Sequence, residues 1–203
     1  MGRKIYRSDS RTGDRLMKIS NAPIPDVKII ELQKHEDERG YFARTWCRKE
    51  LAEAGIDMVI AQCNISFNKH RGTMRGMHYQ VPPHTEQKIV FCIKGRIFDV
   101  AVDLRPDSLT FAKYFGVELS AENKKQLFIP DGFAHGFLTL ENNTEIYYLM
   151  GNFYAPDASR GVRYNDPRFG IQWPEKIAFI NERDANYPDS DEENIRNEFR
   201  FSR

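Results

Sequence analysis

The chain has 203 residues, of which 40% are hydrophobic and 12% are aromatic. This composition is typical of a globular protein and argues against a disordered one, and the length suits one large domain. Thirty basic residues nearly balance 29 acidic ones, so the net charge of +1 argues against a dedicated nucleic-acid-binding protein.

The sequence shows no sign of a disulfide framework, an export signal or a membrane span. Its cysteines, Cys47, Cys63 and Cys92, are odd in number and widely spaced. The first 18 residues are polar and basic, and the longest strongly apolar runs, such as residues 89–93, are too short to cross a bilayer. We therefore expect a cytoplasmic protein without membrane contacts.

The predicted elements begin after a basic N-terminal stretch. Residues 1–20 are predicted to be a flexible extension, and Met17 is an alternative start of the chain. A first strand is predicted near residues 27–30, and a short helix at residues 49–54 is expected to end at Gly55. Further strands are predicted at residues 58–62, 87–93, 96–104, 111–119, 126–129, 136–140 and 144–150.

The strand predicted at residues 96–104 alternates clearly. It places Ile97, Asp99 and Ala101 on one face, and Phe98, Val100 and Val102 on the other. Many short strands with little helix predict an all-β sandwich or barrel, most simply a jelly roll. The chain then turns irregular after Pro174, and residues 189–203 are predicted to be a polar C-terminal tail.

Two histidines lie in motifs with the spacing of a cupin barrel. Pro130, Gly132 and His135 reproduce the spacing of the second cupin motif. Gly72 and His78 fit the start of the first motif. Both motifs together favour a cupin fold for this all-β chain.

The metal ligands of a cupin are only partly present. A metal-binding cupin gathers three histidines and a glutamate, whereas this chain offers His78, His135 and Glu86, with Gln80 at the position of the remaining histidine. A neutral amide is a poor ligand for a divalent transition ion. The spacing therefore predicts a barrel without a metal, whose histidines are free for acid–base chemistry.

Ordered matches along most of the chain extend this similarity. They lie at residues 37–42, 62–66, 75–80, 98–105, 117–123, 129–137, 154–156 and 166–167. With them the chain resembles the dTDP-4-dehydrorhamnose 3,5-epimerase family and related nucleotide-sugar epimerases. The resemblance implies a cupin jelly-roll β-barrel with short helices over residues 21–188, irregular tails, a homodimer, and neither a metal nor an organic cofactor.

The resemblance also implies a reaction. The substrate would be a nucleoside-diphosphate 4-keto-6-deoxyhexose, in which carbons 3 and 5 both adjoin the ketone. A base removes a proton to give an enolate, and an acid on the other face returns one.

For each step of that reaction, the chain has a suitable residue at a position that matches the family. His78 matches the base, Asp184 the carboxylate that orients it, Lys88 the group that stabilises the oxyanion, and Tyr148 the acid. The residues expected to bind the substrate are Arg39 and Arg75 near the diphosphate, Gln62 and Asn64 near the sugar, His135, and Tyr154.

Other functions remain open from the sequence. The nearest is a mono-epimerase acting at carbon 3 or carbon 5 of a related sugar nucleotide, such as a CDP-linked one. A keto-isomerase, a metal-dependent cupin oxygenase and a non-catalytic sugar-nucleotide-binding module are further alternatives. The sequence does not identify the nucleotide base or the hydroxyl pattern of the sugar.

Overall fold

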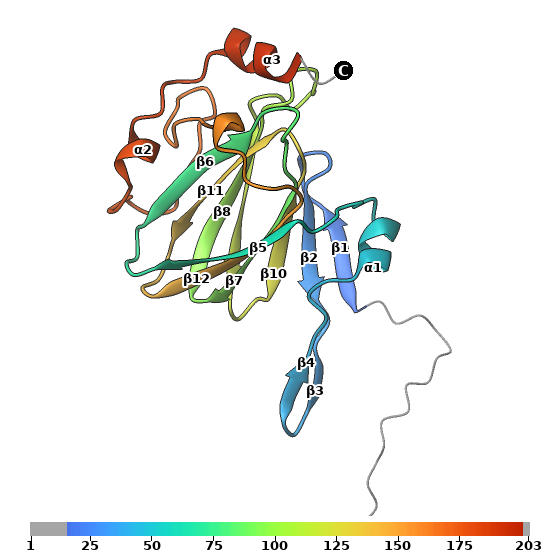
Figure 1. Cartoon of the computed structure of the whole chain (residues 1–203). Helices are drawn as coiled ribbons and strands as arrows, with labels where there is room; N and C mark the ends of the chain where they lie inside the picture. Colours follow the sequence, from blue (N-terminus) through green and yellow to red (C-terminus); the bar gives the residue numbers. More distant parts are fainter. Residues whose placement is uncertain (1–15, 201–203) are drawn as a thin grey trace, which may run out of the picture.

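Two antiparallel sheets face each other in the computed structural model, which describes residues 16–200 (Figure 1). The six-stranded sheet has the order β1-β2-β10-β7-β12-β5, and the five-stranded sheet has the order β13-β6-β11-β8-β9. Their strands are β1 Met17–Asn21, β2 Lys28–Leu32, β5 Gln62–Asn68, β6 Met74–Gln80, β7 Lys88–Lys94, β8 Arg96–Asp103, β9 Tyr114–Ser120, β10 Lys125–Ile129, β11 Phe133–Thr139, β12 Thr144–Met150 and β13 Ser159–Gly161. In the described part of the chain no strand pair joins the two sheets, so the jelly roll is open at its edges.

The remaining elements are short. A hairpin of β3 (His35–Asp37) and β4 (Gly40–Phe42) projects away from both sheets (Figure 1). The helices are α1 Arg48–Glu53, the 3-10 turn Pro156–Ala158, α2 Glu182–Ala185 and α3 Glu192–Arg200. Among residues 16–200, none of the helices has the length and hydrophobicity that crossing a bilayer requires.

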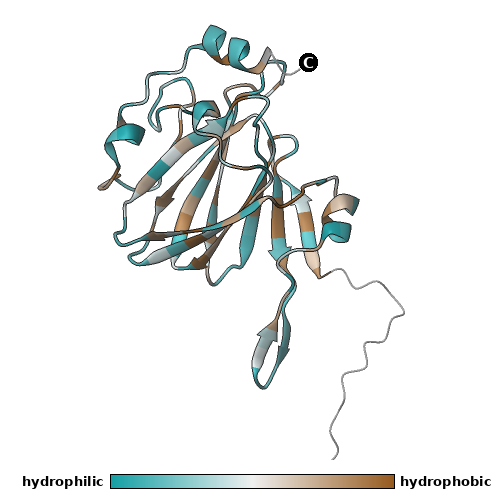
Figure 2. Ribbon diagram, in the orientation of Figure 1, coloured by the Kyte–Doolittle hydropathy of each residue, from teal (hydrophilic) through white to brown (hydrophobic). Residues whose placement is uncertain are grey.

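Burial on both faces of each sheet explains the fold. The space between the sheets is filled by one apolar cluster, to which β8 contributes Ile97 and Ala101. The opposite face of β8 contributes Val100 and Val102 to a second cluster, which residues 162–199 cover. A third cluster lies under α1 on the outer face of the six-stranded sheet, around Leu51. Hydrophobic bands accordingly follow the strands, while α2 is hydrophilic (Figure 2).

The expected all-β, cupin-like fold is confirmed, and the alternation predicted for residues 96–104 matches the two faces of β8. Some elements differ from the prediction. Residues 58–61 are not a strand, and the strand begins at Gln62 because only there does the chain pair with β12. The prediction also lacked β6, whose polar residues hide the alternation.

Both predicted tails contain ordered structure. Residues 1–15 lie outside the described part of the chain, but β1 starts at Met17 and pairs with β2, so the sheet begins inside the expected extension. At the other end, residues 192–200 form α3 instead of an irregular tail. Its Ile195 is 2% exposed, and burying this side chain holds the helix on the second apolar cluster.

Candidate active site

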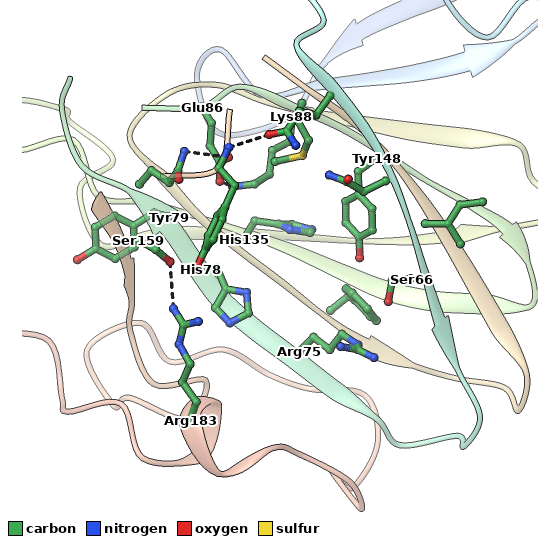
Figure 3. Close-up of a pocket in the computed structure, with 17 residues that line it drawn as sticks. Ser66, Arg75, His78, Tyr79, Glu86, Lys88, His135, Tyr148, Ser159 and Arg183 are labelled. Carbon is green, nitrogen blue, oxygen red and sulfur yellow. Dashed lines mark hydrogen bonds and ion pairs between the residues drawn. The ribbon is translucent and has the colours of Figure 1, made fainter. Parts of the chain in front are cut away.

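A pocket of about 450 Å³ opens between the two sheets (Figure 3). Eight of the ten site residues expected from the sequence line it: Gln62, Asn64, Arg75, His78, Lys88, His135, Tyr148 and Tyr154. They come from β5, β6, β7, β11 and β12 and from the segment after β12. The jelly roll therefore brings together residues that are up to 92 positions apart in the sequence.

His78 is held by a buried carboxylate. Its Nε2 lies 2.8 Å from Oδ1 of Asp184, and Oδ2 of the same carboxylate accepts a hydrogen bond from the backbone N–H of Gly76. Asp184 is positioned by α2, where the Asn181 side chain caps the helix by accepting from the backbone N–H of Asp184. The His78 side chain is 40% exposed and Asp184 is 1% exposed, so the imidazole reaches the pocket from a fixed, buried anchor.

This carboxylate stays ionised. Burial alone would raise the pKa of Asp184, but the hydrogen bonds from His78 and Gly76 outweigh burial and hold the pKa below its ordinary value. An ionised Asp184 that accepts Nε2–H leaves the lone pair of Nδ1 available on the imidazole. This is the arrangement of an oriented general base.

His135 forms a second histidine–aspartate pair beside the first. Its Nε2 lies 2.8 Å from Oδ1 of Asp99, and these two side chains are only 6% and 0% exposed. The other oxygen of Asp99 has no hydrogen-bond partner among the described residues. Asp99 was not among the expected site residues, although its place beside Ile97 and Ala101 on one face of a predicted strand was a usable signal.

Tyr148 lies on the opposite sheet from His78. Its pKa is raised, first by burial and then by the charge of Asp99, so its hydroxyl stays protonated and able to donate. Its ring packs edge-to-face on that of His135, with centroids 6.3 Å apart. The neighbouring Tyr147 instead packs on Phe91 at the outer cluster. The two adjacent tyrosines therefore lie on opposite faces of the sheet.

The Lys88 side chain extends from β7 into the pocket and forms an ion pair. Its Nζ lies 2.8 Å from Oε1 of Glu86, and the two side chains are 6% and 9% exposed. Gln80 donates to Glu86 and to the carbonyls of His84 and Phe153, and its own oxygen accepts from the backbone N–H of Ala155. Gln80 therefore braces this wall of the pocket.

The donor set for a metal is incomplete. Within residues 16–200, no group of three or more His, Cys, Asp or Glu side chains is placed so that it could hold a metal ion. His78 and His135 bond to their own aspartates, and Glu86 bonds to Lys88. The residues present thus do not fit the metal site of a cupin.

The mouth of the pocket is polar and positively charged. Nε of Arg75 donates to Asn68, which orients this guanidinium, and Gln62 accepts from the backbone N–H of Tyr154. A second guanidinium, that of Arg183, lines the pocket and donates to the Ser159 hydroxyl (Figure 3). Arg183 was missed from the sequence, although it directly precedes Asp184.

Arg39 lies elsewhere in the chain. It sits at the turn of the β3–β4 hairpin, where it forms an ion pair with Asp37, and its side chain is 87% exposed. The structure therefore does not bring Arg39 to the pocket of its own chain. The sequence identified Arg39 by its motif, but the direction of the hairpin depends on the rest of the fold.

Fold and site together define an open, cupin-like jelly roll whose pocket holds a histidine bonded to a buried aspartate, a protonated tyrosine and a buried lysine. A model of the dTDP-4-dehydrorhamnose 3,5-epimerase family matches residues 21–192. The chain therefore belongs to the dTDP-4-dehydrorhamnose 3,5-epimerase family.

Individual relatives agree with this assignment. The chain is 43% identical over 171 residues to the dTDP-4-dehydrorhamnose 3,5-epimerase of Shigella flexneri, covering 84% of this chain and 94% of that one. The crystal structure of the same enzyme from Elizabethkingia anophelis is 41% identical, with a TM-score of 0.83 over 86% of this chain and 96% of that one. The dTDP-6-deoxy-D-glucose-3,5-epimerase of Legionella pneumophila was solved in complex with dTDP-4-keto-L-rhamnose. It is 40% identical, with a TM-score of 0.79 over 84% of this chain and 91% of that one.

Proposed function

We propose that this chain epimerises carbons 3 and 5 of a thymidine-diphosphate-linked 4-keto-6-deoxyhexose. The observation that carries the proposal is the placement of His78 on one sheet and Tyr148 on the facing sheet, with the pocket between them (Figure 3). His78 is in addition bonded to Asp184 of α2. The names of the relatives, and the sugar nucleotide bound to the Legionella enzyme, support the substrate class.

The proposed reaction begins with His78. Its imidazole takes the proton from a carbon beside the ketone, the C–H electron pair forms the enolate, and the negative charge passes to the ketone oxygen. The side chain of Lys88 stabilises that oxygen, because a buried positive group fixed beside the oxygen strongly stabilises charge that develops there. Asp184 stabilises the imidazolium that results.

Tyr148 completes the inversion. Its hydroxyl gives a proton to the carbon on the face opposite His78, and the enolate collapses to the ketone. The imidazolium of His78 then loses its extra proton to solvent, and the tyrosinate of Tyr148 takes up a proton from solvent. Burial and the charge of Asp99 keep this hydroxyl protonated at neutral pH, as the role requires. The same pair of groups acts at carbon 3 and carbon 5 when the sugar ring presents each carbon in turn.

The arginines at the mouth of the pocket are proposed to bind the diphosphate. Arg75 and Arg183 line the pocket, and planar guanidinium groups bind phosphate oxygens in pairs. The ring of Tyr154 is 58% exposed at the same mouth and offers a face on which a nucleobase stacks. Gln62 and Asn64 line the same pocket and are proposed to contact the sugar.

We propose further that the protein is a homodimer in which Arg39 serves the pocket of the other copy. The hairpin that carries Arg39 also exposes Phe42, which is 65% exposed, and edge strand β5 exposes Ile65 and Phe67. Exposed apolar side chains gathered on an unpaired edge and a projecting hairpin are typical of an interface between copies.

Mixing two inactive variants tests this arrangement. Arg39→Ala and His78→Asn remove groups of the same site from different copies, so a mixture that exchanges subunits forms one complete site per heterodimer. We expect the mixture to regain activity that neither variant has alone. A mixture that stays inactive after verified exchange, or a monomer by light scattering, contradicts the shared site.

The substrate itself is tested by incubating the wild-type protein with the thymidine-diphosphate 4-keto-6-deoxy sugar in deuterated water. We expect deuterium and inversion at both carbons. Label at one carbon alone would identify a mono-epimerase. Stoichiometric iron together with activity that a chelator abolishes would identify the metal-dependent alternative.

A further inference from the structure

Tyr187 lies against the catalytic base from the side that faces away from the pocket. In the β13–β6 ladder Gly161 pairs with His78, and this glycine leaves the space beside the imidazole without a side chain. The ring of Tyr187 occupies that space: a Cβ at Gly161 would lie only 2.2 Å from Cζ of Tyr187. The glycine is thus required by the close approach of the ring.

The two rings meet edge to face. Their centroids are 6.1 Å apart and their planes are inclined by 71°, a geometry that aromatic pairs prefer. On the other side of β6, the residue paired with His78 is His135. The imidazole of His78 is therefore flanked by the Tyr187 ring on one side and by strand β11 on the other. It is also bonded to Asp184.

Tyr187 is anchored by the same segment that carries Asp184. It follows Asp184 by three positions, just beyond α2, and the guanidinium of Arg183 lies over its ring, 5.7 Å from the centroid. One short segment thus supplies both the carboxylate that bonds to His78 and the ring that packs on it.

A second cavity lies beyond Tyr187. It measures about 480 Å³ and is bounded by Tyr187, Gly161 and residues of α3, among them Ile195 and Glu198. Tyr187 lines this cavity and does not line the catalytic pocket. The ring therefore lies between this cavity and the bond of His78 with Asp184.

The ring, and not the hydroxyl, makes these contacts. The hydroxyl oxygen of Tyr187 is buried and has no hydrogen-bond partner among the described residues. Phenylalanine would keep the ring contacts described above and would remove only the hydroxyl and its electrostatic interaction with the Arg183 guanidinium.

We infer that Tyr187 is a positioning residue for the base: its ring fixes the imidazole of His78 in the orientation bonded to Asp184 and keeps water from that bond. The inference rests on the proposed role of His78 in proton transfer. Because Tyr187 makes no contact with the substrate in this proposal, its replacement should lower kcat and leave substrate binding unchanged.

Two variants of Tyr187 test the inference. For Tyr187→Leu, which removes the ring, we expect kcat for deuterium exchange to fall at least 30-fold while KM stays within about threefold. For Tyr187→Phe we expect kcat within twofold of wild type. Unchanged kcat in Tyr187→Leu, a loss confined to KM, or equal losses in both variants would overturn the inference. If Tyr187→Leu does not fold, Tyr187→Met is measured against the same limits.

A second measurement needs no substrate. In ¹⁵N-labelled protein, the N–H shared by His78 and Asp184 is expected to give a downfield proton signal in wild type and in Tyr187→Phe, and to disappear into exchange with water in Tyr187→Leu. A signal that is absent from wild type, or that persists in Tyr187→Leu, contradicts the inference. If wild type shows this signal pattern but exchanges no deuterium into the sugar, the proposed function fails and the positioning role stands.

Discussion

His78 and His135 are paired residues of β6 and β11, and each bonds through Nε2 to its own aspartate at 2.8 Å. Their surroundings divide the two roles. The His78 side chain is 40% exposed to the pocket, whereas that of His135 is 6% exposed and packs on Tyr148. Under the proposed mechanism, exposure to the pocket suits His78 to act as the base, and burial suits His135 to support Tyr148.

Loss of the carboxylate behind the base is expected to reduce turnover. Asp184→Asn removes the group that selects the tautomer of His78 and stabilises its charged form, so we predict a fall in kcat of about 10²- to 10⁴-fold. The measurement is the rate of solvent deuterium entry into the sugar.

Asn181→Ala is the matched control for that variant. It removes the cap of α2 without touching the carboxylate, and should cost about 1 kcal/mol of stability. Its kcat should change by less than tenfold. Equal losses of turnover in the two variants would mean that Asp184 acts only by holding α2.

Loss of the acid is expected to separate proton removal from inversion. Tyr148→Phe deletes one hydroxyl, while His78 can still remove a proton and return a deuteron to the same face. We predict that inversion falls at least about 100-fold and that deuterium still enters with retained configuration. Tyr147→Phe, which alters the outward-facing neighbour, should leave inversion unchanged. Full inversion by Tyr148→Phe would show that another group is the acid.

Lys88 is expected to affect both stability and turnover, and a double variant separates these effects. Lys88→Met leaves Glu86 buried without its partner, which should cost about 3 kcal/mol in the free energy of unfolding. Adding Glu86→Gln removes that unpaired charge and should restore most of the stability. Turnover should remain about 100-fold reduced in the double variant, because the cation at the oxyanion is still missing. Restored turnover would refute that role.

The buried Asp103 gives a prediction of pH-dependent stability away from the site. Burial alone would raise its pKa, but hydrogen bonds from Arg105, Ser108 and Thr110 outweigh burial and lower the pKa. A folded-state pKa below the unfolded one stabilises the protein above about pH 4, and the effect is lost as the pH falls through the folded value.

Asp103→Asn should therefore destabilise the protein by about 3 kcal/mol at pH 7. The difference from wild type should shrink below about pH 4, where the carboxylate of the unfolded chain takes up its proton while the folded one is still ionised. Urea unfolding of both proteins at pH 7 and pH 3 measures this. An equal difference at the two pH values would show that the charge of Asp103 is not what stabilises the fold.

The sequence predicted the fold and eight of the residues that line the pocket, but only one of the two aspartates that bond to the histidines. Alternation identified β8, and the spacing of the two histidine motifs indicated the cupin fold. The strand that carries His78 was not predicted, because Arg75, His78 and Gln80 interrupt the apolar pattern and β6 is stabilised by pairing on both sides.

Long-range packing accounts for the rest. Asp99 becomes a partner of His135 only when β8 and β11 pair, and the place of the Tyr187 ring depends on β13 lying beside β6. Arg39 shows the converse: its motif was recognisable, but the hairpin carries it away from the pocket of its own chain. Local sequence patterns identify candidate reacting side chains. The positions of Asp99 and Tyr187 beside the two histidines can be known only once the sheets have assembled.

The most direct test follows deuterium into the sugar by NMR, with the wild-type protein and His78→Asn compared at equal concentration. The account predicts that wild type labels and inverts both carbon 3 and carbon 5, and that His78→Asn loses at least about 10³-fold of the exchange rate at both carbons while remaining folded. Undiminished exchange by His78→Asn at either carbon would contradict the assignment of His78 as the base.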